Sequence, residues 1–145
     1  MKRINRRYEL LVFDWDGTLM DSTAAIATCI QSAARDLGLT VPDDARASHV
    51  IGLGLKDALA YAVPELAERD YGKLTERYRH HFLALGGVTP LFDGTADMLS
   101  ELQKAGHSLA IATGKSTQGL ERALEATGVG HFFLAMRCAD RCAPK

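Results

Sequence analysis

The chain has 145 residues, of which 47% are hydrophobic, so it can bury one core and a small second domain, and intrinsic disorder is excluded. Its 17 basic and 18 acidic residues give a net charge of -1, which excludes a broad electrostatic surface for nucleic acid or an anionic membrane. The apolar run at residues 10–13 is too short for a signal peptide, and no later run reaches the roughly 18 residues of a membrane span. We therefore expect a cytoplasmic protein with neither nucleic acid nor membrane as a partner.

A buried strand is predicted at residues 8–13, where a short apolar run stops at a polar turn. Beyond it the periodicity changes to that of a helix. Asp21, Ser22 and Thr23 are typical N-cap residues, and Gly38 is a typical stop. The apolar positions between them recur at helical spacing: Ile26, Ala27, Ile30, Ala33, Ala34 and Leu37.

The middle of the chain is predicted to be nearly all helical. Gly52-Leu53-Gly54 interrupts the chain before a short apolar helix at 55–63, which Pro64 ends. A longer helix follows and closes at Gly86-Gly87. One face of it is apolar: Tyr71, Leu74, Tyr78, Phe82 and Leu85. The region from about 23 to 85 therefore reads as an inserted helical domain.

After this region the pattern alternates between helices and strands. A helix is predicted at 95–105, a strand at 108–112, a helix capped by Ser116 and running to 127, and a third strand at 132–136. Strands that are separated by helices favour right-handed crossovers and a parallel, doubly wound α/β sheet.

The motif Asp14-Trp15-Asp16-Gly17-Thr18-Leu19 follows directly on the first strand. Two carboxylates brought together at a strand end are costly without a cation or a shared proton, so the pair indicates a chemical purpose, with phosphoryl transfer as the leading hypothesis. Ligands of open parallel sheets gather at the carboxyl ends of the strands, where Thr113 also lies. The alternative, a hairpin turn at Asp16-Gly17, would need a second strand, but a helix follows.

Together with this motif, the helical insertion, Ala112-Thr113-Gly114-Lys115 after a strand and the closing Ala143-Pro144-Lys145 resemble the haloacid dehalogenase superfamily, in its phosphoglycolate phosphatase-like branch. The resemblance implies a Rossmann-like doubly wound parallel sheet with an inserted helical cap. The core would comprise residues 1–20 and 88–145, and the cap residues 21–87. With about three strands, the chain would lack the C-terminal part of the core and a further acidic motif.

The resemblance also implies roles for the paired carboxylates. Asp14 would attack phosphorus and form an aspartyl-phosphate. Asp16 would protonate the leaving alkoxide and later accept a proton from water. A carboxylate oxygen of Asp14 and the backbone carbonyl of Asp16 would hold Mg²⁺, which prefers oxygen ligands.

The same resemblance implies contacts with the phosphate. Gly17 and Thr18 would let backbone N–H groups face its oxygens, and Gly114 would lie beside it. Thr113 would donate its hydroxyl, although a strand-end threonine also commonly caps the next helix. Lys145 would neutralise charge between nucleophile and phosphate, although a terminal lysine is often merely frayed.

Two segments that contain a lysine could bind a phosphate or be ordinary turns. Gly114-Lys115-Ser116 resembles the end of a nucleotide-binding P-loop, but Leu109 stands where that motif requires glycine. Lys56, next to the Gly52–Gly54 turn, would suit a small acidic phosphate ester, or else is a solvated lysine after an ordinary turn. Residues 79–81 are expected to be a solvated helix face.

These observations predict a Mg²⁺-dependent phosphatase for a small phosphorylated metabolite, with phosphoglycolate as the best single candidate. A 2-haloacid dehalogenase is the alternative enzyme, but it would not need the proton donor Asp16. A third interpretation is an inactive fragment that associates with another chain through the exposed edge of its first strand.

Overall fold

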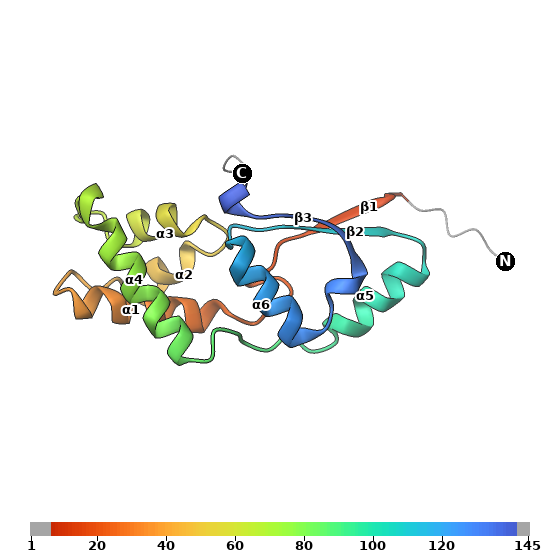
Figure 1. Ribbon diagram of the computed structural model, residues 1–145, viewed down its shortest axis with the longest axis horizontal. Coiled ribbons are helices and arrows are strands. Elements are labelled where there is room, and N and C mark those ends of the chain that lie inside the picture. Colours follow the sequence, from red (N-terminus) through yellow and green to blue (C-terminus); the bar gives the residue numbers. More distant parts are fainter. Residues whose placement is uncertain (1–6, 142–145) are drawn as a thin grey trace.

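A three-stranded parallel sheet forms one end of the molecule (Figure 1). The computed structural model describes residues 7–141. Strands β1 (Leu10–Phe13), β2 (Ser108–Ala112) and β3 (Phe133–Arg137) lie in the order β1-β2-β3, and their register aligns Val12 with Ala110 and Ala110 with Ala135. The α/β class that was predicted from the alternation of strands and helices is confirmed.

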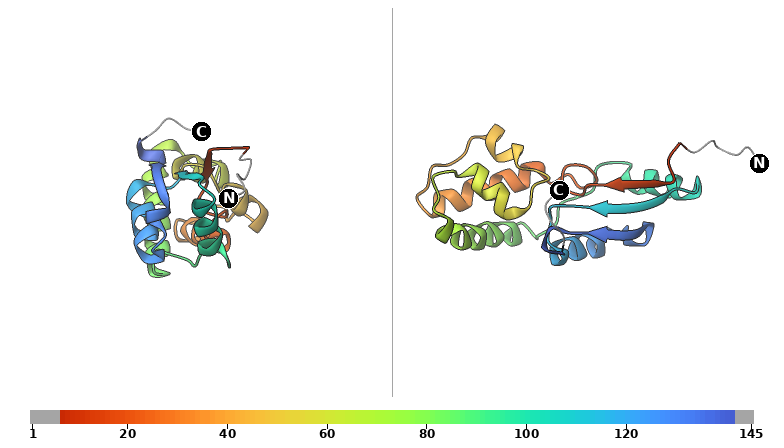
Figure 2. Two further views of the ribbon diagram at one scale, coloured as in Figure 1. Left: turned by 90° about the vertical axis from the view of Figure 1, so that its right-hand side faces the viewer. Right: turned by 90° about the horizontal axis from the view of Figure 1, so that it is seen from above.

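Helices α5 (Thr95–Lys104) and α6 (Thr117–Thr127) connect the strands and lie on the same face of the sheet (Figures 1 and 2). A 3-10 turn at Gly130–Phe132 precedes β3 and another at Ala139–Arg141 follows it. The core between sheet and helices is continuous. Its buried members are Trp15, Leu19, Met20, Leu99, Leu109, Ile111, Leu120, Ala123, Val129, Phe133 and Cys138.

The other face of the sheet is open. The prediction of a buried strand at residues 8–13 is therefore wrong. The strand begins only at Leu10, and residues Leu10 and Val12 are 51% and 57% exposed. Leu134 of β3 is 66% exposed. Alternate residues of a strand point to opposite faces. No helix within residues 7–141 covers this face, and β1 pairs only with β2 there, so β1 is an edge strand.

Four helices form the other end of the molecule: α1 (Thr23–Asp36), α2 (Asp44–His49), α3 (Leu55–Ala62) and α4 (Tyr71–Ala84), with a 3-10 turn at Glu68–Asp70 before α4. They enclose a second core that shares no residue with the first. Its buried members are Ile30, Ala33, Ala34, Val50, Ala58, Leu59, Ala62, Val63, Leu66 and Leu74. No helix within the described residues is long and apolar enough to cross a membrane.

The helical region was predicted with two errors. Helix α2 was missed; it is short and is capped by the side chain of Asp43, which accepts the N–H of Arg46 at 2.8 Å. Leu85, which was placed on the apolar face of α4, lies beyond the end of that helix and is 57% exposed. A helix of six residues is too short for its periodicity to be recognised.

Two chain segments join the sheet to the helices, and they are hydrogen-bonded to each other. The N–H of Asp21 donates to the carbonyl of Pro90 at 2.8 Å, and the N–H of Phe92 donates to the carbonyl of Leu19 at 3.0 Å. Residues 21–87 therefore leave and re-enter the sheet part at one place.

The loop at residues 50–54, between α2 and α3, crosses the carboxyl end of the sheet and is called the crossing loop below. A Cβ atom on Gly52 would lie 3.3 Å from Oδ2 of Asp14, and one on Gly54 would lie 3.8 Å from Ala139. At the end of β2 the contact is tighter, because a Cβ on Gly114 would lie 2.6 Å from the carbonyl carbon of Leu53. The loop thus touches the residues that follow all three strands.

An ion pair ties α1 to α4. The carboxylate of Asp36 accepts hydrogen bonds from Nε and an Nη of Arg77 at 2.9 and 2.7 Å, and it lies 2.7 Å from Nε2 of His81. Bonding to Arg77 and then to His81 lowers the pKa of Asp36 below its ordinary value. The stabilisation is therefore present above the unfolded pKa, about 3.9, and is lost as the pH falls through the folded pKa.

We expect Asp36→Asn to lower the Tm at pH 7, because the neutral amide loses the charge-assisted bonds. In thermal unfolding followed by circular dichroism, the difference in Tm from the wild type should persist to about pH 5 and shrink below about pH 3.9. Glu76→Gln, an exposed change on α4, is the matched control. Equal Tm values for wild type and Asp36→Asn at pH 7 would contradict the role of the ion pair.

We expect Gly114→Ala to destabilise the fold by about 1–3 kcal/mol, since the added methyl group overlaps the backbone of Leu53. Urea unfolding measures the change. Gly72→Ala is the control, because a Cβ at this position in α4 meets nothing within 4 Å. That change should stabilise the protein by about 0.5–1 kcal/mol. Unaltered stability of Gly114→Ala would mean that the loop does not rest on the end of β2.

Candidate active site

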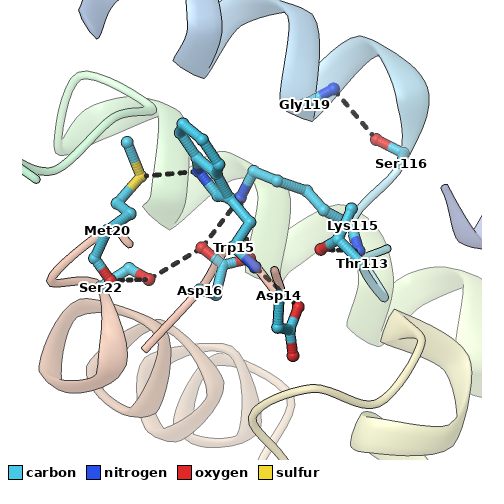
Figure 3. Close-up of polar contacts among 9 residues, drawn as sticks. All are labelled: Asp14, Trp15, Asp16, Met20, Ser22, Thr113, Lys115, Ser116 and Gly119. Carbon is cyan, nitrogen blue, oxygen red and sulfur yellow. Dashed lines mark hydrogen bonds and ion pairs between the residues drawn. The ribbon is translucent and has the colours of Figure 1, made fainter. Parts of the chain in front are cut away.

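Three polar side chains that were singled out in the sequence lie where β1 and β2 end side by side (Figure 3). Asp14 and Asp16 follow β1, and Thr113 follows β2. The parallel register pairs Phe13 with Ile111, so the residues just beyond them are neighbours at one edge of the sheet. This is the edge at which open parallel sheets bind ligands.

The indole of Trp15 anchors the segment between the two aspartates. It is completely buried, and its Nε1–H lies 3.2 Å from the sulfur of Met20. The carbonyl of Trp15 faces three successive N–H groups, those of residues 18–20, at 3.0–3.2 Å. This turn holds both flanking carboxylates at the end of β1.

Two donors hold the carboxylate of Asp16. The hydroxyl of Ser22, which is fully buried, donates to Oδ1 at 2.8 Å. The ammonium of Lys115 lies 3.3 Å from both carboxylate oxygens. The side chains of Lys115 and Asp16 are only 11% and 13% exposed, so solvent screens this ion pair weakly.

The carboxylate of Asp14 has a different environment. Its Oδ1 accepts the backbone N–H of Trp15 at 2.7 Å, and its Oδ2 lies beside Gly52 of the crossing loop. Figure 3 shows the two carboxylates turned in different directions, that of Asp16 toward Ser22 and Lys115 and that of Asp14 away from them. The two carboxylates thus begin at the same strand end and bind separate partners.

The hydroxyl of Thr113 is buried at the start of the β2–α6 turn. The residue is 4% exposed, and its Oγ1 accepts the N–H of Lys115 at 3.1 Å, which leaves the hydroxyl proton able to serve as a donor. The cap of α6 is a different residue, Ser116, whose Oγ accepts the N–H of Gly119 at 3.2 Å. Thr113 is therefore not used as the cap.

Asp140 supplies a second cap that the sequence pattern did not reveal. Its Oδ1 accepts the N–H and the hydroxyl of Thr117 at 3.0 and 2.8 Å. These bonds lower the pKa of Asp140. The contact attaches the turn after β3 to the first turn of α6, and no local spacing links residues that are 23 positions apart.

The two residues of the Gly17-Thr18 turn use their N–H groups within the loop. Gly17 has φ +75° and donates to the carbonyl of Met20 at 2.9 Å, while Thr18 is exposed and donates to that of Trp15 at 3.2 Å. The phosphate contact that the family resemblance implies for these two residues stays a prediction. Gly114 lies at the end of β2 under the crossing loop.

Of the cations that were singled out in the sequence, only Lys56 lies within the described residues, and it is paired elsewhere. Lys56 pairs at 3.2 Å with Glu68, and the two side chains are 68% and 81% exposed. Lys145 lies outside the described residues. Within the described residues the cation at Asp16 is Lys115, which belongs to the Ala112-Thr113-Gly114-Lys115 motif but was given no role at the carboxylates from the sequence. Its position two residues after Thr113, in the turn at the end of β2, is the one sequence feature that could have suggested a place near the site.

A cavity of about 900 Å³ lies between the sheet and the helices. The sheet part contributes Asp16, Thr113 and Lys115, and the helical part contributes Tyr78, Arg79, Phe82 and the crossing loop. Burial, with a smaller effect from the negative charge of Asp16, raises the pKa of Tyr78 well above its ordinary value. The hydroxyl of Tyr78 is therefore neutral at physiological pH.

The oxygen atoms of Asp14 and Asp16 are the candidate metal ligands at the end of β1. Within residues 7–141 no group of three or more His, Cys, Asp or Glu side chains is arranged to hold a metal ion. Asp14 and the backbone carbonyl of Asp16 remain as a small oxygen donor set. Such a set fits Mg²⁺, which usually keeps several waters and binds one or two carboxylates together with substrate phosphate.

Comparison with known proteins gives one family. The model described as haloacid dehalogenase-like hydrolase matches residues 11–145. The tyrosine-protein kinase PtkA of Mycobacterium tuberculosis is 34% identical over 127 residues, which are 86% of this chain and 42% of that protein. A phosphoglycolate phosphatase of Agrobacterium fabrum is 32% identical over 136 residues, which are 90% of this chain and 58% of that protein.

A solved structure described as a predicted phosphoglycolate phosphatase from Haemophilus somnus superposes with a TM-score of 0.81 at 27% identity, covering 96% of this chain and 66% of that one. The chain thus spans about half the length of the curated relatives named here. The fold match and the family match agree with the motif that follows β1. The chain belongs to the haloacid dehalogenase-like hydrolase family.

Proposed function

We propose that this chain hydrolyses a small phosphomonoester through an aspartyl-phosphate on Asp14, with phosphoglycolate as the best single substrate. One observation carries the proposal: the carboxylates of Asp14 and Asp16 end β1 beside the buried hydroxyl of Thr113, beneath a loop of the helical part. The similarity to a phosphoglycolate phosphatase supports the choice of substrate class.

The surroundings of Asp14 suit a nucleophile. The Trp15 N–H donates to Oδ1, which holds the carboxylate at the end of β1. Gly52 has no side chain beside Oδ2, and its φ of +94° is one that other residues rarely adopt. Attack by a carboxylate oxygen of Asp14 would form a bond from that oxygen to phosphorus and break the P–O bond to the leaving group.

Asp16 would move the protons of both steps. As an acid it would protonate the departing alkoxide, and as a base it would then accept a proton from the water that attacks the aspartyl-phosphate. That second attack breaks the bond between the Asp14 oxygen and phosphorus, releases inorganic phosphate and restores Asp14. The Thr113 hydroxyl would donate a hydrogen bond to a phosphate oxygen in both steps.

Mg²⁺ is proposed as the cofactor, held by a carboxylate oxygen of Asp14 and the backbone carbonyl of Asp16. When bound, the ion would reduce the repulsion between the carboxylate and the anionic phosphate. The aspartates would keep the substrate in line, and the crossing loop would limit the access of water. We propose residues 21–87 as the cap that performs this closure.

We expect Asp14→Asn to abolish the release of p-nitrophenolate from p-nitrophenyl phosphate, because an amide cannot form the phosphoenzyme. Absorbance in a buffer with Mg²⁺ measures the reaction. Asp21→Asn, an exposed change at the junction with the helices, is the matched control and should retain activity.

Two further arms complete this test. Chelation of Mg²⁺ with EDTA should stop the wild-type reaction, and added Mg²⁺ should restore it. Chloroacetate replaces the ester to test for a 2-haloacid dehalogenase, and no chloride release is expected. Full activity of Asp14→Asn would refute the nucleophile, and halide release without ester hydrolysis would favour the dehalogenase.

The open face of the sheet favours a second candidate, an inactive chain that associates with another copy. Leu10 and Val12 of β1 lie on this face with Leu134 of β3, and β1 is an edge strand within the described residues. Exposed apolar edges pair readily with other chains.

For this candidate we expect light scattering after size exclusion to give the mass of a dimer, and Val12→Lys to shift it to a monomer by placing a charge on the face. Leu85→Lys, at an exposed apolar position of the helical part, is the control and should leave the mass unchanged. A monomeric wild-type chain with phosphatase activity would exclude the candidate.

A further inference from the structure

Lys115 is enclosed by contacts along its whole length. Its N–H donates to Thr113 Oγ1 at 3.1 Å, and its carbonyl accepts the N–H of Ala139 at 3.1 Å. Its aliphatic stem lies against Gly119 in the first turn of α6, where a Cβ would be 3.2 Å from Cγ of the lysine. The absence of a side chain at Gly119 therefore makes room for the stem.

The ammonium of Lys115 bridges the two parts of the molecule. It lies 3.3 Å from both oxygens of Asp16 on the sheet side and 5.1 Å from the ring centroid of Phe82 on α4. A cation over an aromatic face at this distance is attracted to it. The ring of Phe82 is itself stacked on that of Tyr78, with the two centroids 6.0 Å apart. The position of the cation thus depends on both the sheet and helix α4.

We propose that Lys115 is a positioning residue that orients the Asp16 carboxylate for proton transfer to the leaving group, and that Phe82 makes this orientation depend on the seating of α4. The inference rests on the proposed phosphatase function. The hydroxyl of Ser22 contacts only Oδ1 of Asp16. By itself this single hydrogen bond would leave the plane of the carboxylate able to rotate. The contact of Lys115 with both oxygens restricts that rotation.

The test compares two esters that differ in their need for a proton. p-Nitrophenolate leaves as a stable anion, whereas the alkoxide of phosphoglycolate must be protonated as the P–O bond breaks. Since kcat/KM covers the steps up to departure of the alcohol, the ratio of the two kcat/KM values reports proton delivery. A uniform loss of folding or of phosphate binding lowers both values and leaves the ratio unchanged.

For Lys115→Met we expect kcat/KM on phosphoglycolate to fall on the order of 100-fold, the lower range for loss of general acid catalysis, and that on p-nitrophenyl phosphate to fall far less. Lys115→Arg should recover most of the loss, because it keeps the charge. Phe82→Leu should shift the ratio in the same direction by a smaller factor. Lys73→Met, which removes an exposed pair with Asp70, should leave the ratio unchanged.

The outcomes separate the two proposals. A wild-type chain that hydrolyses neither ester overturns the proposed function and the inference with it. Equal losses on both esters in Lys115→Met, or a rise in KM alone, overturn only the inference and indicate that Lys115 acts in folding or in binding substrate phosphate. If Lys115→Met does not fold, Lys115→Arg and Phe82→Leu decide the question, and an unchanged ratio in Phe82→Leu removes the link to α4.

Discussion

The structure depends on how two negative charges are held at the end of one strand. Asp14 and Asp16 are separated only by Trp15, and the burial of that indole brings both carboxylates to the edge of the core. A buried charge is costly unless it is paired or hydrogen-bonded. Each carboxylate has its own partners, a backbone N–H for Asp14 and the Ser22–Lys115 pair for Asp16. The polar contacts of the site follow from this requirement.

The partners of Asp16 link the carboxylates to the rest of the fold. Ser22 stands at the junction with the helices, and Lys115 stands in the turn after β2. The crossing loop makes two close contacts with the sheet end, and each involves a glycine. Gly52 of the loop lies beside Asp14, and Gly114 after β2 lies beneath Leu53 of the loop. A displacement of the helical part would therefore alter the surroundings of both aspartates, because the crossing loop, Ser22 and Lys115 connect them to it.

The two faces of the sheet have different roles. One face packs against α5 and α6 and supplies the core that supports the site. The other presents Leu10, Val12 and Leu134 without cover from residues 7–141. Both crossovers lie on one side because consecutive strands are neighbours in the order β1-β2-β3 and the connections share one hand. The same topology that builds the site therefore leaves the opposite face apolar and open.

Local sequence patterns determined the elements, the parallel sheet and the presence of Asp14, Asp16 and Thr113 at neighbouring strand ends, because apolar periodicity, caps and turns act over a few residues. Only the tertiary structure decided which cation meets Asp16. Lys115 is 99 residues away from it in sequence, so no spacing rule connects the two. The exposed edge of β1 was already expected from the resemblance to a family with more strands. How much of β1 is exposed was decided by the tertiary structure, since an apolar strand has the same composition whether or not a neighbour covers it.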